Sequence, residues 1–138
     1  MKKTIQFLFT TILILYGCEK INNTGPNNIE TPEGLLHWDI IKVEGQTSGF
    51  VNDTISLDVY CPTSSGCDYI SSFGSEKNGN IVYIKAFGNT RKDIPCTMAA
   101  VPIVVKYKFV SKSVGRFELQ FIKRDNSVIK HYLTIRNK

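Results

Sequence analysis

The chain has 138 residues, of which 42% are hydrophobic and 21% are charged, and its formal net charge is +5. This length accommodates one ordinary domain and excludes most multidomain arrangements. The apolar and charged contents are close to globular averages, which excludes a wholly disordered or collagen-like chain.

The N-terminal residues predict an export signal. Residues 1–3 include two lysines, and the twelve residues from Ile5 to Tyr16 are mostly apolar. That run is too short to cross a bilayer as a helix, which needs about 20 residues, so it predicts a signal peptide over residues 1–17 that is removed. Leu15-Tyr16-Gly17-Cys18 resembles the lipobox of bacterial lipoproteins, whose cysteine is lipidated and becomes the new N-terminus. The alternative is a plain secretory signal followed by an unmodified cysteine.

The lipobox resemblance implies a membrane anchor at Cys18. Two or more acyl chains anchor a protein stably, whereas a single chain anchors it weakly. Glu19 differs from the Asp that holds some Gram-negative lipoproteins at the inner membrane, so we expect the outer membrane, with the protein facing the periplasm or the cell surface. Residues 1–17 hold two of the 17 basic side chains, so the mature chain has 15 basic and 12 acidic residues and a net charge of +3. Export and this modest charge predict no nucleic-acid partner.

Residues 18–34 are predicted to form a lipidated cysteine and a flexible tether. The segment from Glu19 to Gly34 has four Asn, two Pro and two Gly but only two aliphatic residues. Such a composition cannot bury itself in a core. The folded domain is therefore expected over residues 35–138.

The domain is patterned at period two, which predicts strands with one buried face. The alternating runs are Ile55–Cys61, Ile103–Phe109, Phe117–Phe121 and Ile129–Ile135. His37–Val43 and Asn80–Phe87 are apolar on both sides and predict buried or bulged strands, and Asp68–Phe73 predicts a short strand. Turn-forming stretches such as Gly45–Asp53 and Gly74–Asn80 separate them, and no window of helical length has a 3.6-residue period. About seven short strands predict an all-β, two-layer antiparallel β-sandwich, with a small closed β-barrel as the alternative.

A stretch near the C-terminus resembles a known type of sandwich. The sequence SVGRFELQF, residues 113–121, is similar to the penultimate strand of immunoglobulin-like and fibronectin-type domains, where a glycine precedes an aromatic residue at the strand start. The resemblance implies an immunoglobulin-like β-sandwich.

The domain has three cysteines, Cys61, Cys67 and Cys96, in what we expect to be an oxidising compartment. Their spacing leaves all three pairings open, although Cys61 lies on a predicted inward face where a free thiol packs as a small hydrophobe. Gly66-Cys67, Cys96-Thr97 and Gly115-Arg116-Phe117 together resemble small lipoproteins of Bacteroidetes. With that resemblance, we expect a Cys67–Cys96 disulfide. Three cysteines without suitably spaced histidines predict no metal site.

Two surface features suggest ligands or modification. Arg116, Lys130, Tyr132 and Arg136 fall on outward positions of the last two strands and could contact an anionic glycan, although such charges more often form only a solvated face. Asp53-Thr54-Ile55 resembles the acceptor sequence for O-glycosylation in Bacteroidetes, which would place a glycan on Thr54.

No motif for nucleophilic, metal-dependent or nucleotide chemistry is present, so we predict no cofactor and no enzymatic activity. The function we expect is a binding or assembly module at the envelope, with a glycan or an envelope protein as partner. One alternative is a small glycan- or peptidoglycan-acting hydrolase centred on His131 or Asp68. Another is an accessory subunit of an outer-membrane complex, docked through an apolar patch around Val101–Val104.

Overall fold

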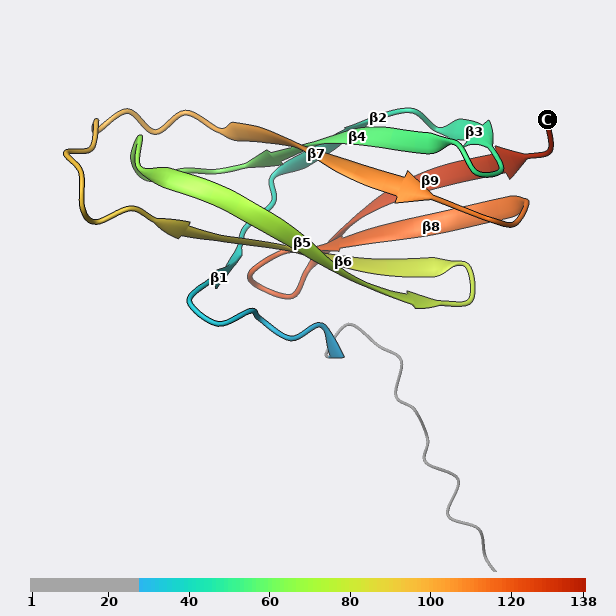
Figure 1. Cartoon of the computed structure of the whole chain (residues 1–138), viewed down its shortest axis with the longest axis horizontal. Coiled ribbons are helices and arrows are strands. Elements are labelled where there is room, and N and C mark those ends of the chain that lie inside the picture. Colours follow the sequence, from blue (N-terminus) through green and yellow to red (C-terminus); the bar gives the residue numbers. More distant parts are fainter. Residues whose placement is uncertain (1–27) are drawn as a thin grey trace, which may run out of the picture.

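The computed structural model describes residues 28–138, and its extended elements are nine β-strands (Figure 1). The signal peptide, Cys18 and residues 18–27 of the expected tether lie outside the described residues. The strands are β1 (Leu36–Trp38), β2 (Lys42–Gly45), β3 (Ser48–Phe50), β4 (Thr54–Cys61), β5 (Asp68–Asn78), β6 (Ile81–Thr90), β7 (Ile103–Val110), β8 (Gly115–Ile122) and β9 (Val128–Arg136).

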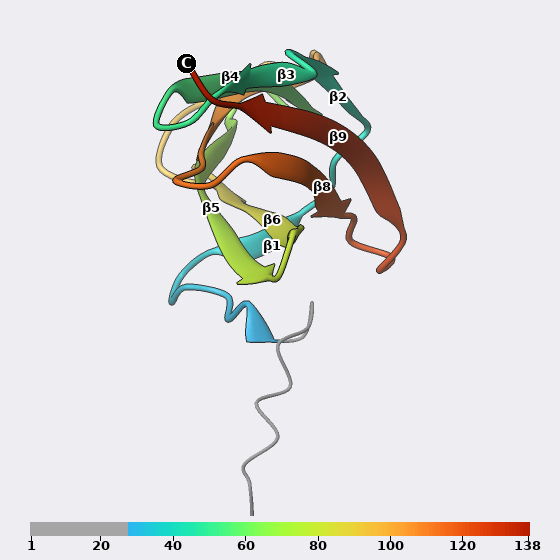
Figure 2. The same ribbon diagram turned by 90° about the vertical axis from the view of Figure 1, so that its right-hand side faces the viewer.

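The strands form two sheets that pack face to face (Figures 1 and 2). In the larger sheet, β5 pairs with one edge of β6, and β1 and β8 pair with different parts of the other edge; β9 and then β3 follow β8. The smaller sheet has the order β2-β4-β7. This arrangement confirms the all-β sandwich predicted from the period-two pattern.

Two features of the sheets differ from the expected antiparallel sandwich of about seven strands. β3 pairs with β9 in parallel, and β6 pairs with β8 in parallel, so the larger sheet is mixed. Two short strands, β1 and β2, replace the one predicted over His37–Val43, because the chain leaves the larger sheet at Asp39 and joins the smaller one. β3 lies within Gly45–Asp53, which we predicted as a turn.

The core lies between the inward faces of the two sheets. Alternate residues of β4, namely Ile55, Leu57, Val59 and Cys61, are at most 2% exposed, as the pattern predicted. Tyr107 of β7 packs edge-on against both Phe73 and Phe121 of the larger sheet, with ring centroids 5.4 Å and 5.5 Å away. These aromatic contacts fill the space between the sheets and add to the stabilisation from apolar burial.

A second, smaller apolar cluster lies on the outer face of the larger sheet. Ile29 is 8% exposed and packs with Phe87 and Ile122. Gly74, which we predicted to begin a turn, is instead inside β5, and a Cβ there would lie 2.6 Å from Cγ2 of Ile29 and 2.7 Å from Cε2 of Phe87. Residues 28–34, the described part of the expected tether, therefore pack against the domain.

The Cys67–Cys96 disulfide is present, as expected from the resemblance. It links the start of β5 to the exposed loop between β6 and β7, with the two Cα atoms 5.3 Å apart. Cys61 is a free, fully buried thiol. Burial raises the pKa of this thiol to about 12, and the negative charge of Asp39 adds to the effect.

Candidate functional site

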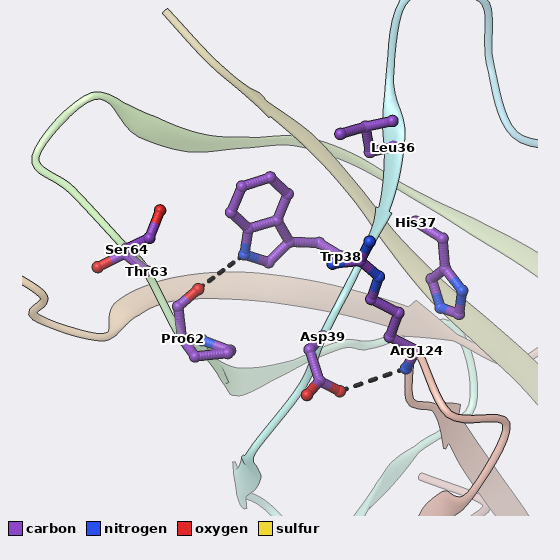
Figure 3. A pocket seen from close by; sticks show the side chains of 8 residues that line it. All are labelled: Leu36, His37, Trp38, Asp39, Pro62, Thr63, Ser64 and Arg124. Carbon is purple, nitrogen blue, oxygen red and sulfur yellow. Dashed lines mark hydrogen bonds between the residues drawn. The ribbon is translucent and has the colours of Figure 1, made fainter.

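A hollow of about 350 Å³ opens where β1 meets the end of β4 and the β8–β9 turn (Figure 3). Its side chains come from three separate parts of the chain: residues 36–39, residues 62–64 and Arg124. The members that carry polar or aromatic chemistry are His37, Trp38, Asp39, Thr63, Ser64 and Arg124. Concave sites with a few polar groups beside an apolar wall are the usual form of small-ligand sites.

The aromatic wall is fixed in place by the backbone. Trp38 is half-buried against the main core, and its indole Nε1 donates a 2.8 Å hydrogen bond to the carbonyl oxygen of Pro62 (Figure 3). A buried or half-buried indole needs such an acceptor, since its N–H is otherwise left without water. The bond joins β1 to the segment after β4 and holds the ring at the edge of the hollow.

Asp39 positions the turn that carries Arg124. Its Oδ1 accepts a 2.9 Å hydrogen bond from the backbone N–H of Ile40 and a 3.3 Å bond from the backbone N–H of Arg124. The first bond supports the chain where it leaves β1, and the second ties the β8–β9 turn to that point. Arg124 is exposed, and in Figure 3 its side chain extends back toward Trp38 and His37.

His37 is held by a backbone carbonyl. Its Nε2 lies 3.1 Å from the carbonyl oxygen of Ile122, which can only accept, so Nε2 carries the proton. The other histidine, His131, makes the same kind of bond, with Nε2 2.8 Å from the carbonyl oxygen of Gln46. Both imidazoles therefore use Nε2 in joining neighbouring segments.

The hollow can recognise a ligand by three kinds of contact. The indole of Trp38 offers an apolar face, Asp39 offers a carboxylate, and Arg124 offers a planar donor group. The hydroxyl of Thr63 donates a 2.8 Å bond to the carbonyl oxygen of Val101, which links this rim to the β6–β7 loop. Within residues 28–138, no group of three or more His, Cys, Asp or Glu side chains is arranged to hold a metal ion.

Three of the four residues predicted as a ligand face line two other hollows. Arg116 stacks over the ring of Tyr132 at 4.8 Å, and both line a hollow of about 420 Å³ together with Glu118. Lys130 shares the outer face of the sheet but forms a 2.7 Å ion pair with Glu118. Arg136 lines a different hollow of about 310 Å³. The structure thus brings Arg116 and Tyr132 together and places Arg136 apart from them.

Asp68, one of the two centres considered for a hydrolase, has a structural role. Its carboxylate accepts hydrogen bonds from Ser64 N (2.6 Å), Ser65 N (3.1 Å) and the Thr90 hydroxyl (2.6 Å). Burial alone would raise the pKa of Asp68, but these bonds outweigh it and lower the pKa from 3.8 to about 2. The group is therefore ionised at neutral pH, where it fixes the loop before β5.

Two other predicted positions lie elsewhere on the surface. Thr54 is exposed at the first residue of β4 and lines the same hollow as Arg136. Val101 and Val104 are 67% and 48% exposed, and Met98 in the same loop is 93% exposed. The structure thus leaves the expected glycosylation site accessible, and it exposes Met98 as well as the valines of the expected apolar patch.

Sequence reasoning missed most of the Trp38 hollow. The only local signal was the neighbouring pair His37-Trp38, which begins the strand predicted over His37–Val43. Asp39 and Arg124 are 85 positions apart, and Trp38 and Pro62 are 24 apart, so no local pattern joins them. No protein-family model, curated protein or solved structure matches the chain. Among residues 28–138, no helix is long and apolar enough to cross a membrane.

Proposed function

We propose that the chain is a lipid-anchored protein of the bacterial outer membrane, and that its sandwich binds a saccharide in the hollow beside Trp38 without transforming it. The anchor is Cys18, and the basis for it is the resemblance of residues 15–18 to a lipobox. The proposal that the sandwich is immunoglobulin-like has its basis in residues 113–121. Domains of that kind present the loops at the ends of their sheets to partners.

The observation that carries the binding proposal is the combination of an indole, a carboxylate and a guanidinium around one hollow. One face of a pyranose ring carries mostly C–H groups, which pack on an aromatic surface, while its hydroxyls pair with charged planar groups. A hollow of about 350 Å³ has the size of a site for one or two sugar units.

The way the polar side chains are held favours binding over catalysis. Hydrogen bonds to backbone groups engage His37 Nε2, Trp38 Nε1 and Asp39 Oδ1. The bond to Ile122 keeps the proton of His37 on Nε2, so that nitrogen cannot act as a general base. Groups fixed in this way form a rigid, pre-organised surface, which reduces the entropy lost when a ligand binds.

The single tryptophan of the chain provides a direct assay. Titration of the purified protein with fragments of envelope polysaccharide and peptidoglycan should change Trp38 emission in a saturable way for at least one of them. Arg124→Ala should weaken that binding about tenfold or more, because a charge-assisted hydrogen bond is lost from an exposed residue without disturbing the core. Lys112→Ala, at an exposed position of the β7–β8 turn, is the matched control and should bind normally.

Two outcomes would contradict the proposal. If no fragment changes Trp38 emission, or if Arg124→Ala binds as the unmodified chain does, the hollow is not a saccharide site. If the fragments are shortened during the titration, as mass spectrometry would show, the protein is a hydrolase.

A second candidate function is assembly with an envelope protein. The loop between β6 and β7 exposes Met98 and Val101 by 93% and 67%, and the Cys67–Cys96 disulfide anchors its middle. Exposed apolar side chains on an anchored loop are typical of protein contacts. A photoreactive residue at Met98 should then form a crosslink to one protein in intact cells, and a crosslink to none would leave saccharide binding as the function.

A further inference from the structure

The segment that leads into the domain, residues 28–34, runs along the outer face of the larger sheet. Asn28 Nδ2 donates to Glu76 Oε1 at 3.5 Å, Lys85 Nζ donates to the carbonyl oxygen of Ile29 at 3.3 Å, and Asn89 Nδ2 donates to that of Gly34 at 2.6 Å. Ile29 is 8% exposed against Phe87 and Ile122. Figures 1 and 2 show the blue segment lying beneath β5 and β6, on the side away from the smaller sheet.

The length of chain before this point limits how the domain can face a membrane. Ten residue steps separate Cys18 from Asn28 and span at most about 36 Å when fully extended. A domain of this size has a radius of gyration of about 13 Å, so a path half-way around its surface is about 50 Å long. A lipid on Cys18 can therefore reach the bilayer from the outer face of the larger sheet, but the chain is too short to pass around to the smaller sheet.

The exposed part of this face has the chemistry of a membrane-contacting surface. Arg116 and Tyr132 are exposed and stacked, with the guanidinium carbon 4.8 Å from the ring centroid. Tyr83 and Lys85 of β6 lie on the same face, nearer to Ile29. Tyrosine is enriched at the headgroup level of bilayers, and basic side chains there attract anionic lipids.

We propose that the outer face of β6, β8 and β9 rests on the bilayer, with Arg116 and Tyr132 contacting anionic phospholipid headgroups. The inference rests on the proposed anchor at Cys18. The smaller sheet then faces away from the membrane, with its outward residues such as Tyr60 in solvent. The hollow lined by Arg116, Glu118 and Tyr132 belongs to this contact surface rather than to a soluble ligand.

Photo-crosslinking of the full, lipidated chain tests this orientation. Tyr132 and Tyr60 are tyrosines at outward positions of the two opposite sheets, so each is replaced in turn by p-benzoylphenylalanine. The proteins are placed in vesicles of phosphatidylethanolamine with a minority of phosphatidylglycerol and irradiated, and lipid adducts are counted by mass spectrometry. We expect several-fold more adducts at position 132 than at position 60. Arg116→Gln should lower the share of phosphatidylglycerol among the adducts about fivefold, whereas Lys108→Gln on the smaller sheet should not.

The outcomes separate the orientation from the anchor. Fatty-acid labelling of the same samples reports whether Cys18 is lipidated. Equal adduct yields at positions 132 and 60 in a labelled protein would overturn the orientation while leaving the anchor in place, as would an unchanged phosphatidylglycerol share in Arg116→Gln. A protein without label would remove the anchor and, with it, the premise of the orientation.

Discussion

Asp68→Asn should destabilise the fold in a way that depends on pH. Asp68 is 7% exposed as a residue, and its carboxylate receives hydrogen bonds from Ser64, Ser65 and Thr90 that hold its pKa at about 2, against 3.8 in the absence of such contacts. The single oxygen of an asparagine amide can accept only some of these hydrogen bonds. Because the loop lies near the surface, water screens part of the charge and limits the effect. We therefore expect a loss of about 1–2 kcal/mol in the free energy of unfolding at neutral pH.

The direction of the pH effect follows from the lowered pKa. Because the carboxylate binds a proton more weakly in the folded state, its contribution is complete above its unfolded pKa of 3.8 and is lost as the pH falls toward 2. Urea unfolding of Asp68→Asn and of the unmodified chain should therefore differ clearly at about pH 7 and much less at about pH 2. Asp93→Asn, in the exposed β6–β7 loop, is the control. If the two proteins differ in the free energy of unfolding by the same amount at both pH values, the charge of Asp68 contributes nothing to stability and this explanation is refuted.

Three further predictions concern other parts of the chain. Cys61, whose buried thiol has its pKa raised to about 12, should react with iodoacetamide near neutral pH only after unfolding, and labelling of the folded protein would contradict its burial. Ile29→Ala should lower the free energy of unfolding by about 2 kcal/mol and speed hydrogen exchange at residues 29–35, because it removes contacts with Phe87 and Ile122; unchanged exchange would show that the segment is not docked. Cys18→Ala should abolish metabolic labelling with a fatty acid, and label that persists would place the anchor elsewhere.

The strand faces were predictable because one-sided burial leaves a direct trace in the sequence. Residues Ile55–Cys61 and Phe117–Phe121 alternate between apolar and polar types, and their apolar members are buried in the structure. β5 was predicted too short because Gly74 and Ser75 have the composition of a turn. Gly74 is in fact needed inside the strand, where Ile29 passes too close for a side chain. That contact joins residues 45 positions apart, so no local pattern could reveal it.

The candidate site was not predictable for a related reason. Period two assigns a side chain to a face of a sheet, but it carries no information about which strand ends and loops converge. Arg116 and Tyr132 do share a face, as predicted. Register sets Lys130 opposite Gln120, and Lys130 forms its ion pair with Glu118, which lies diagonally across the two strands. Trp38, Asp39 and Arg124 converge through hydrogen bonds between the side chains of Trp38 and Asp39 and backbone groups of distant segments. Where those backbone groups lie depends on the turn geometry, which leaves no local pattern in the sequence.

The parallel pairing of β6 with β8 links the fold to both proposals. Register sets Ile84 beside Phe121, and both point into the core, whereas Ile81 lies beside the outward Glu118. The outward residues of β6 therefore continue the face that carries Arg116 and Tyr132. Further along the same edge of β6, residues 86–88 pair with β1, which ends at Trp38. One strand thus supports the face proposed to contact lipid and the strand that carries the indole of the hollow. Arg124, which lines the Trp38 hollow, follows the end of β8, whereas Arg116 lies at the start of that strand. The proposed headgroup contact at Arg116 therefore leaves the hollow open to a saccharide.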